Sequence, residues 1–129
     1  MNILVVEDDA DLCVEIVEYL ERRNHRVSGR GTVAAARQAL AEMADKAPLD
    51  GVVCDVGLPD GDGLRLYIES VAHTPNCRWI LMSGAHDMER LRLVLRDLKI
   101  KPAVLEKPLP LRLLCDALEK GHGRQGSPR

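Results

Sequence analysis

Several side chains that could handle a phosphoryl group stand directly after short apolar runs. An acidic row at residues 7–9 follows the first run, Asp55 the third, Ser83 the fourth and Lys107 the fifth. Clustered carboxylates repel one another unless a cation neutralises them. Mg²⁺ takes a few carboxylate oxygens and leaves positions open for phosphate. An Asp carboxylate can attack phosphorus and hold the group as an acyl phosphate. We therefore expect Mg²⁺-dependent phosphoryl transfer to Asp55.

Such a transfer needs neutralised charge and fixed geometry more than acid–base chemistry. Lys107 would supply positive charge, Ser83 a hydrogen bond to a phosphoryl oxygen, and Gly84 the room for the group. Taken one at a time, these residues could equally be helix caps, turn residues or solvated charges. The functional interpretation is favoured because each stands at the carboxyl end of a predicted parallel strand, where open α/β sheets bind ligands.

Five apolar runs alternate with stretches of helical period along the chain. The expected strands cover residues 2–6, 26–29, 51–54, 78–82 and 103–105. Unbroken apolar pairs such as Val52 and Val53 indicate strands that are covered on both faces. The run at 26–29 is only weakly apolar, which predicts an edge strand.

Helix start and stop signals separate these strands. We expect a first helix over about 10–23 with Asp9 as N-cap and a second from a Thr32 cap to about Ala44. A third should follow Asp62-Gly63, a fourth should begin at an Asp87 cap, and the last should have Pro110 in its first turn and end before Gly121. The alternation predicts an α/β fold: a single doubly wound, flavodoxin-like parallel sheet of five strands in the order 2-1-3-4-5, with five helices. We expect one domain over residues 1–120, with 121–129 as a disordered tail or the start of a linker.

Composition narrows the possible partners. The chain has 129 residues, a formal charge of −2 and 46% hydrophobic residues, a balance that gives no reason to expect nucleic-acid binding. Its apolar runs are too short for membrane insertion, and its start does not resemble a signal peptide, so we expect a cytoplasmic protein. The widely spaced Cys13, Cys54, Cys77 and Cys115 indicate buried reduced thiols. None of the four histidines is expected to form a ligand cluster with a cysteine.

The sequence resembles the receiver domain of two-component response regulators over about residues 2–120. The motifs that carry the resemblance are LVVED at 4–8, DVGLP at 55–59 with Gly61 and Gly63 after it, MSGA at 82–85, and Lys107-Pro108. The resemblance implies that Asp55 is the phosphoacceptor and that Ser83 and Lys107 are the family's hydroxyl and lysine.

The same resemblance implies a metal site and a backbone feature. The family's acidic pair falls on Glu7 and Asp8, which with Asp55 and the backbone carbonyl of Gly57 would bind Mg²⁺. A cis peptide bond is implied between Lys107 and Pro108, in keeping with the near restriction of cis bonds to proline.

The resemblance also implies the partners. The phosphoryl group would come from a sensor histidine kinase or a histidine phosphotransfer protein, and the signal would pass to an unknown downstream protein through protein–protein contacts. The chain would catalyse only its own phosphorylation and dephosphorylation. It would be a stand-alone regulator or a receiver excised from a longer one.

Some positions depart from the family pattern. Val104 stands where the family usually carries an aromatic ring that moves on phosphorylation, so the signal must take another path. Gly57 and Ala85 occupy the two variable positions that tune hydrolysis of the acyl phosphate, and neither can hold an attacking water. We therefore expect slow self-dephosphorylation. Leu93 lies off the core stripe of the fourth helix, and Leu113 off that of the fifth.

The sequence gives less support to three other functions. An aspartyl-phosphate hydrolase would need an acid two residues after the nucleophile, where Gly57 stands. A flavodoxin-like cofactor binder would carry Ser, Thr and Gly after the first strand, where acids would repel a phosphate. A degenerate receiver that only binds partners would not need the intact set of acids, hydroxyl and lysine.

Overall fold

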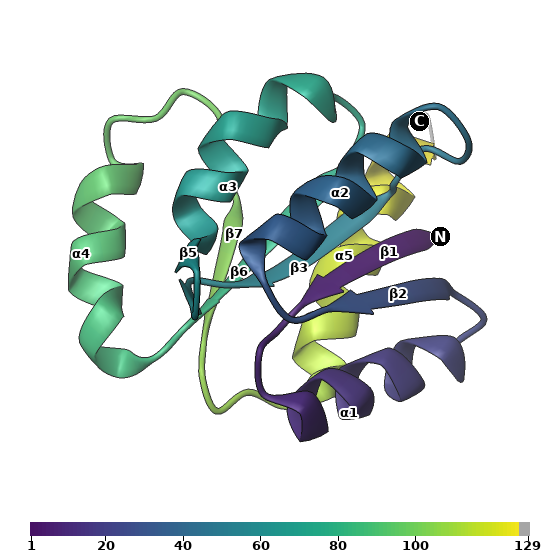
Figure 1. Ribbon diagram of the computed structural model, residues 1–129, viewed down its shortest axis with the longest axis horizontal. Coiled ribbons are helices and arrows are strands. Elements are labelled where there is room, and N and C mark those ends of the chain that lie inside the picture. Colours follow the sequence, from purple (N-terminus) through teal and green to yellow (C-terminus); the bar gives the residue numbers. More distant parts are fainter. Residues whose placement is uncertain (127–129) are drawn as a thin grey trace.

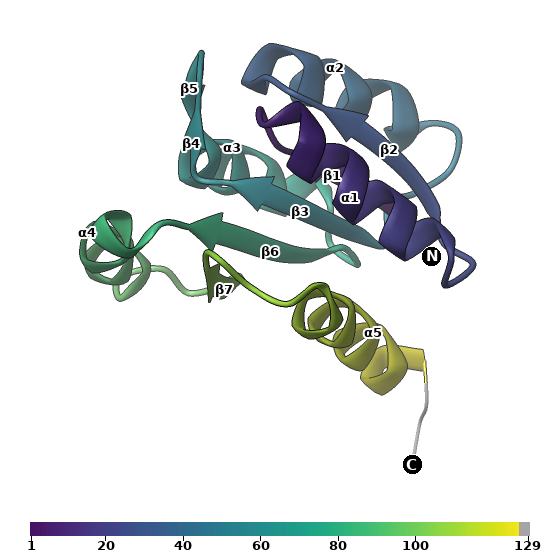
Figure 2. The same ribbon diagram turned by 90° about the horizontal axis from the view of Figure 1, so that it is seen from below.

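A five-stranded parallel sheet forms the centre of the computed structural model, which describes residues 1–126 (Figure 1). The strands are β1 (Asn2–Val6), β2 (Arg26–Arg30), β3 (Gly51–Asp55), β6 (Arg78–Ser83) and β7 (Ala103–Glu106). They lie side by side in the order β2-β1-β3-β6-β7, as Figure 2 shows. Without the two minor strands β4 and β5, this is the predicted order 2-1-3-4-5. The predicted edge position of the second strand is also confirmed.

Five α-helices cover the two faces of the sheet. They are α1 (Ala10–Glu21), α2 (Val33–Ala44), α3 (Gly63–Ser70), α4 (Ala85–Leu95) and α5 (Leu111–Gly126), and a short 3₁₀ turn, η1 (Val71–His73), follows α3. Helices α1 and α5 pack on one face, and α2, α3 and α4 on the other (Figure 1). The predicted flavodoxin-like α/β fold with five helices is confirmed.

Each face of the sheet has its own apolar core because neighbouring strand residues point to opposite sides. Along β1, Ile3 and Val5 face α1 and α5, while Leu4 and Val6 face the other helices, and all four are fully buried. Such burial on both faces explains the unbroken apolar runs in the sequence.

Side-chain caps begin three of the helices, and the caps of α1 and α2 were expected from the sequence. Asp9 accepts from the amides of Asp11 and Leu12, and Thr32 accepts from the amide of Ala35. Asp62 caps α3 by accepting from the amide of Leu64 at 2.8 Å.

Helix α4 begins differently. The expected Asp87 cap is wrong, because Gly84 is the N-cap and Asp87 lies in the first turn. The chain passes from Ser83 at the end of β6 through Gly84 straight into the helix, so the N-terminus of α4 lies one residue from the strand end.

Two helix ends also differ from expectation. Helix α1 stops at Glu21, two residues early, and Asn24 then takes the left-handed backbone angle φ of 70°. Helix α5 continues past Gly121 to Gly126, so the predicted end before Gly121 is wrong. A helical glycine costs only about 1 kcal/mol, which does not by itself end a helix. Of the predicted disordered tail, 127–129 lie outside the described residues, and the division of the chain at residue 120 stays a prediction.

Across residues 1–126, no helix has both the length and the apolar character that a membrane span requires.

A tight hairpin connects β3 to α3. Strands β4 (Gly57–Leu58) and β5 (Gly61–Asp62) pair in antiparallel fashion, and the amide of Gly63 donates to the Val56 carbonyl at 2.8 Å. A Cβ atom at Gly63 would collide with the carbonyl oxygen of Asp55 and lie 2.9 Å from the Cys54 sulfur. Only glycine therefore allows α3 to begin so close to the end of β3.

We expect Gly63→Ala to lower the free energy of unfolding by about 3 kcal/mol, because the added methyl group meets fixed backbone rather than a movable side chain. Urea unfolding followed by the fluorescence of Trp79 measures the change. Gly57→Ala is the matched control, since a Cβ at Gly57 meets no atom within 4 Å. Equal stability of the two variants would contradict the steric explanation.

Candidate functional site

The polar residues expected at the carboxyl ends of the strands do gather at one edge of the sheet. Asp55 and Ser83 are the last residues of β3 and β6, while Glu7 and Lys107 directly follow β1 and β7. The central contact is made by the Lys107 ammonium, which donates to Glu7 Oε1 at 2.7 Å and to Asp55 Oδ2 at 3.1 Å. One cation therefore bridges two carboxylates from different strands.

These charges lie largely out of solvent. The side chains of Glu7 and Asp55 are 1% and 12% exposed, and that of Lys107 is 26% exposed. Burial raises the pKa of Glu7, opposed by hydrogen bonds from Lys107 and from the Asp9 amide. For Lys107, burial lowers the pKa, but the hydrogen bonds to Glu7 and Asp55 outweigh it and the pKa lies above its usual value. Lys107 is thus charged at neutral pH.

Three carboxylates at this edge could share a cation. Oxygen atoms of Glu7, Asp8 and Asp55 lie within 4.8 Å of one another, and Asp8 is exposed, which opens the cluster to solvent. Such a set of carboxylates with room for water is what Mg²⁺ prefers. Asp9 stands apart from the cluster because its carboxylate caps α1.

The hydroxyl of Ser83 is completely buried beside this cluster. It donates to the Gly84 carbonyl at 3.1 Å, while the Lys107 amide donates to the Ser83 carbonyl at 2.8 Å. The second bond holds the ends of β6 and β7 in register. The peptide bond between Lys107 and Pro108 is cis, as the resemblance implied.

One polar contact of the hairpin was not foreseen from the sequence. The Asp60 carboxylate accepts from the amides of Val33 at 2.7 Å and Ala34 at 3.0 Å, in the first turn of α2. These bonds lower the pKa of Asp60. The only signal in the sequence was an acid in a turn just after the strand that ends in Asp55, and no local pattern identifies the helix whose amides that acid would bind.

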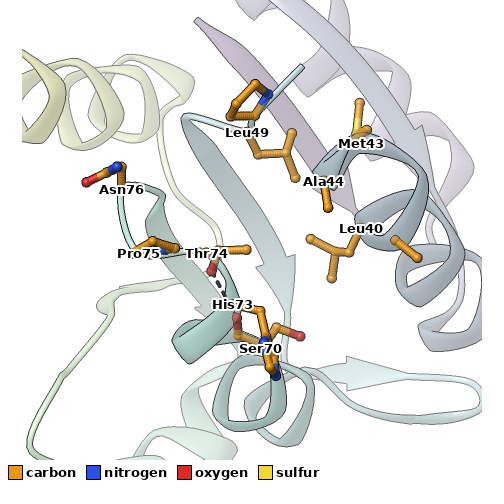
Figure 3. Close-up of a pocket in the computed structure, with 11 residues that line it drawn as sticks. Leu40, Met43, Ala44, Leu49, Ser70, His73, Thr74, Pro75 and Asn76 are labelled. Carbon is orange, nitrogen blue, oxygen red and sulfur yellow. Dashed lines mark hydrogen bonds between the residues drawn. The ribbon is translucent and has the colours of Figure 1, made fainter. Parts of the chain in front are cut away.

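A hollow of about 520 Å³ lies at the other end of the sheet, between the end of α2 and the loop that follows α3 (Figure 3). Leu40, Met43 and Leu49 form its apolar side. The Thr74 hydroxyl already donates to the Ser70 carbonyl at 3.0 Å. The hollow is far from the carboxylate cluster and offers no converging charged groups, so we do not place the function there.

The cysteines and histidines partly contradict expectation. All four cysteines are free; Cys54 and Cys115 are buried as expected, whereas Cys13 and Cys77 are partly exposed. The expectation that no histidine joins a cysteine is wrong, because His25 lies with Cys115 and Glu119 in a possible ligand cluster. Spacing in the sequence could not reveal this, since 94 residues separate His25 from Glu119.

Comparison with known families identifies the class of domain. The response regulator receiver domain family matches residues 3–119, so the chain belongs to this family. Receiver domains are signalling domains of two-component systems rather than enzymes that act on a separate substrate. Among curated proteins, the two-component response regulator ORR24 of Oryza sativa subsp. indica is 30% identical over 95% of this chain. The chain spans only 21% of that relative's length.

Solved structures agree on the fold. A response regulator receiver domain protein from Clostridium thermocellum superposes with a TM-score of 0.84 at 22% identity, over 97% of this chain and 96% of the other. A response regulator protein from Burkholderia pseudomallei, described with a phosphorylated aspartic acid, a calcium ion and citrate, superposes with a TM-score of 0.74 at 21% identity. This match covers 97% of this chain and 71% of the other.

Acidification should weaken the contact that Asp60 makes with α2. The pKa of Asp60 is lowered in the folded protein, so the stability it contributes is present above its ordinary pKa and is lost as the pH falls through the folded value. We expect the difference in unfolding free energy between wild type and Asp60→Asn to be constant above about pH 5 and to close below about pH 4. Urea unfolding at a series of pH values measures it.

The exposed acid Asp97, which follows α4, provides the control as Asp97→Asn. The difference in unfolding free energy between wild type and Asp97→Asn should not disappear over the same pH range. A difference for Asp60→Asn that stays unchanged down to pH 3 would contradict the capping role.

Proposed function

We propose that this receiver domain accepts a phosphoryl group on Asp55 and thereby controls a downstream protein. The observation that carries the proposal is the Lys107 ammonium held between Asp55 and Glu7. In the reaction, a carboxylate oxygen of Asp55 attacks phosphorus, a P–O bond forms, and the bond from phosphorus to the donor breaks. When the donor is a phosphohistidine, the released imidazole nitrogen takes up a proton.

Charge neutralisation would be divided between the protein and a metal ion. We place Mg²⁺ at the carboxylates of Glu7, Asp8 and Asp55 and at the backbone carbonyl of Gly57. Bound there, it would neutralise charge on the transferring group. A relative from Burkholderia pseudomallei, described with both a phosphorylated aspartic acid and a calcium ion, supports this pairing of acceptor and cation.

The remaining residues would bind the phosphoryl oxygens. Lys107 can keep its contact with Asp55 and turn its other hydrogen bonds from Glu7 to the phosphoryl group. The Ser83 hydroxyl can exchange the Gly84 carbonyl, 3.1 Å away, for a phosphoryl oxygen. Gly84 has no side chain to occupy the space beside it.

The partners follow from the same chemistry. A sensor histidine kinase or a histidine phosphotransfer protein would donate the phosphoryl group. Asp55 is only 8% exposed, so the donor must bring its histidine close over the strand ends, where Asp8 and Gly57 are accessible. The downstream protein is unknown, and the chain would act in the cytoplasm, either alone or as part of a longer regulator.

The signal would leave through α4 rather than through a rotating ring. Val104 is partly buried against the core under α2, α3 and α4 and has no ring to turn. Rotation of Ser83 would remove its hydrogen bond to the carbonyl of Gly84, the N-cap of α4, and leave that carbonyl bonded to the Asp87 amide alone. A shift of α4 would then alter a surface where Leu93, Val94 and Ile100 are already exposed. Exposed apolar side chains of this kind suit a protein partner.

Incubation with acetyl phosphate and Mg²⁺ should add the mass of one phosphoryl group to the wild type. We expect no gain in Asp55→Asn, which lacks the nucleophile, or in the presence of EDTA. Asp11→Asn removes an exposed acid outside the cluster and should keep the gain. Intact-mass spectrometry measures all four samples. A gain that persists in Asp55→Asn would contradict the assignment, and so would no gain in the wild type with either acetyl phosphate or phosphoramidate.

The phosphorylated wild type should lose its phosphoryl group slowly. Gly57 and Ala85 are exposed beside the site and offer no polar side chain to orient an attacking water. We expect Gly57→Asn and Ala85→Glu each to speed the decay about tenfold, the effect of one added hydrogen bond of about 1.4 kcal/mol in the transition state. Intact mass recorded against time measures the decay. Unchanged decay in both variants would refute the explanation.

A further inference from the structure

A second cluster of metal-binding side chains lies at the amino end of the sheet, away from Asp55. We propose that His25, Cys115 and Glu119 bind a zinc-type transition-metal ion. Donor atoms of the three side chains lie within 4.8 Å of one another. The proposal does not depend on phosphorylation of Asp55, because the two clusters share no residue.

The fold fixes two of the ligands on one face of α5. Cys115 and Glu119 are four residues apart, so they lie one above the other on the helix surface. Cys115 is completely buried in the core between the sheet and helices α1 and α5. Glu119 is partly exposed at the rim.

The turn after α1 supplies the third ligand. The left-handed conformation of Asn24 reverses the chain, and the amide of His25 donates back to the Leu20 carbonyl at 3.3 Å. The His25 ring is thereby brought against α5, where its side chain is only 9% exposed. Its Nδ1 atom lies 3.2 Å from the Met1 amine nitrogen, which leaves Nε2 directed at Glu119.

Glu119 is already the point where the other two groups meet. His25 Nε2 lies 2.8 Å from Glu119 Oε2, and the Cys115 sulfur lies within 4.8 Å of a carboxylate oxygen of the same residue. The bond with His25 lowers the pKa of Glu119, while burial raises the pKa of Cys115 to about 11. A cation at this point would take the place of the proton between His25 Nε2 and Glu119, and a coordinated thiol loses its proton outright. The neutral imidazole would then carry its proton on Nδ1, so the Met1 amine 3.2 Å away would have to be uncharged.

The mixture of donor atoms selects the class of metal. A thiolate, an imidazole nitrogen and a carboxylate oxygen match Zn²⁺ and do not suit Mg²⁺. Neighbouring ligand atoms in a tetrahedral zinc site are about 3.5 Å apart. The 40%-exposed Glu119 side chain can move to make that spacing, and water can take the fourth position.

The charges of the cluster also balance. A thiolate and a carboxylate together offset the two positive charges of the ion. Besides the Met1 amine at His25 Nδ1, the guanidinium of Arg23 must be considered. It donates to the Tyr19 hydroxyl at 3.0 Å and lies 5.2 Å from the centre of the Tyr19 ring. Arg23 therefore has a partner of its own and need not enter the cluster.

Titration with Co²⁺ tests the site, because cobalt bound to a thiolate absorbs in the near ultraviolet. The full chain is used in buffer with a large excess of Mg²⁺ to occupy the acidic cluster. We expect wild type to develop the thiolate-to-cobalt band with one equivalent, and Zn²⁺ to abolish it by displacement. Cys77→Ser removes a thiol outside the cluster and should keep the band.

Cys115→Ser should lose the band entirely, and His25→Ala should weaken cobalt binding at least about tenfold, as loss of one ligand requires. Zn²⁺ should also raise the thermal midpoint of wild type but not of Cys115→Ser, because a ligand stabilises only a fold that binds it. If Cys115→Ser does not fold, the cobalt affinity of His25→Ala decides the test, since His25 lies in the turn after α1 and outside the apolar core.

No band in wild type, or an equal band in His25→Ala, would overturn the proposal and leave the cluster as a hydrogen-bonded clamp between the α1 turn and α5. Acetyl phosphate labelling of the same samples separates the two proposals. A wild type that takes up phosphate without binding cobalt refutes only the zinc site, and the reverse result refutes only the phosphoacceptor.

Discussion

The ammonium group of Lys107 lies between the carboxylates of Glu7 and Asp55. The arrangement of the polar residues at the carboxyl end of the sheet depends on that contact. Removing three charges from water is costly unless each finds a partner in good geometry. The three residues come from the ends of β1, β3 and β7, so the partnership exists only when the parallel strands are in register. The register in turn is fixed by two apolar cores, one on each face of the sheet.

The chain that leaves Asp55 must turn at once without disturbing it. Gly63 lets the start of α3 pass against the Asp55 backbone, and Asp60 ties the hairpin to the first turn of α2. Asp62 caps α3 and also pairs with Arg90 of α4 at 3.1 Å. The hairpin beside Asp55 is therefore attached to three helices. A change in charge at Asp55 would therefore act on a hairpin that contacts α2, α3 and α4.

The two ends of the sheet differ in chemistry. At the carboxyl end, the hard oxygen ligands around Asp55 suit Mg²⁺. At the amino end, the nitrogen of His25 and the sulfur of Cys115 meet the Glu119 carboxylate and suit a softer ion. We expect the two proposed sites to prefer different ions, and a cation at the second would brace α5 against the turn after α1. Stability and signalling could then respond to different ions.

The sequence by itself determined the sheet, most of the helix starts and the residues at the strand ends. Apolar periodicity and capping are local, so Val52-Val53 and the cap at Thr32 could be interpreted without neighbours. Tertiary structure alone decided the bridge of Lys107, the start of α4 at Gly84 and the meeting of His25 with Cys115. These depend on packing between segments far apart in the chain, which fixes distances that no local pattern of residues encodes.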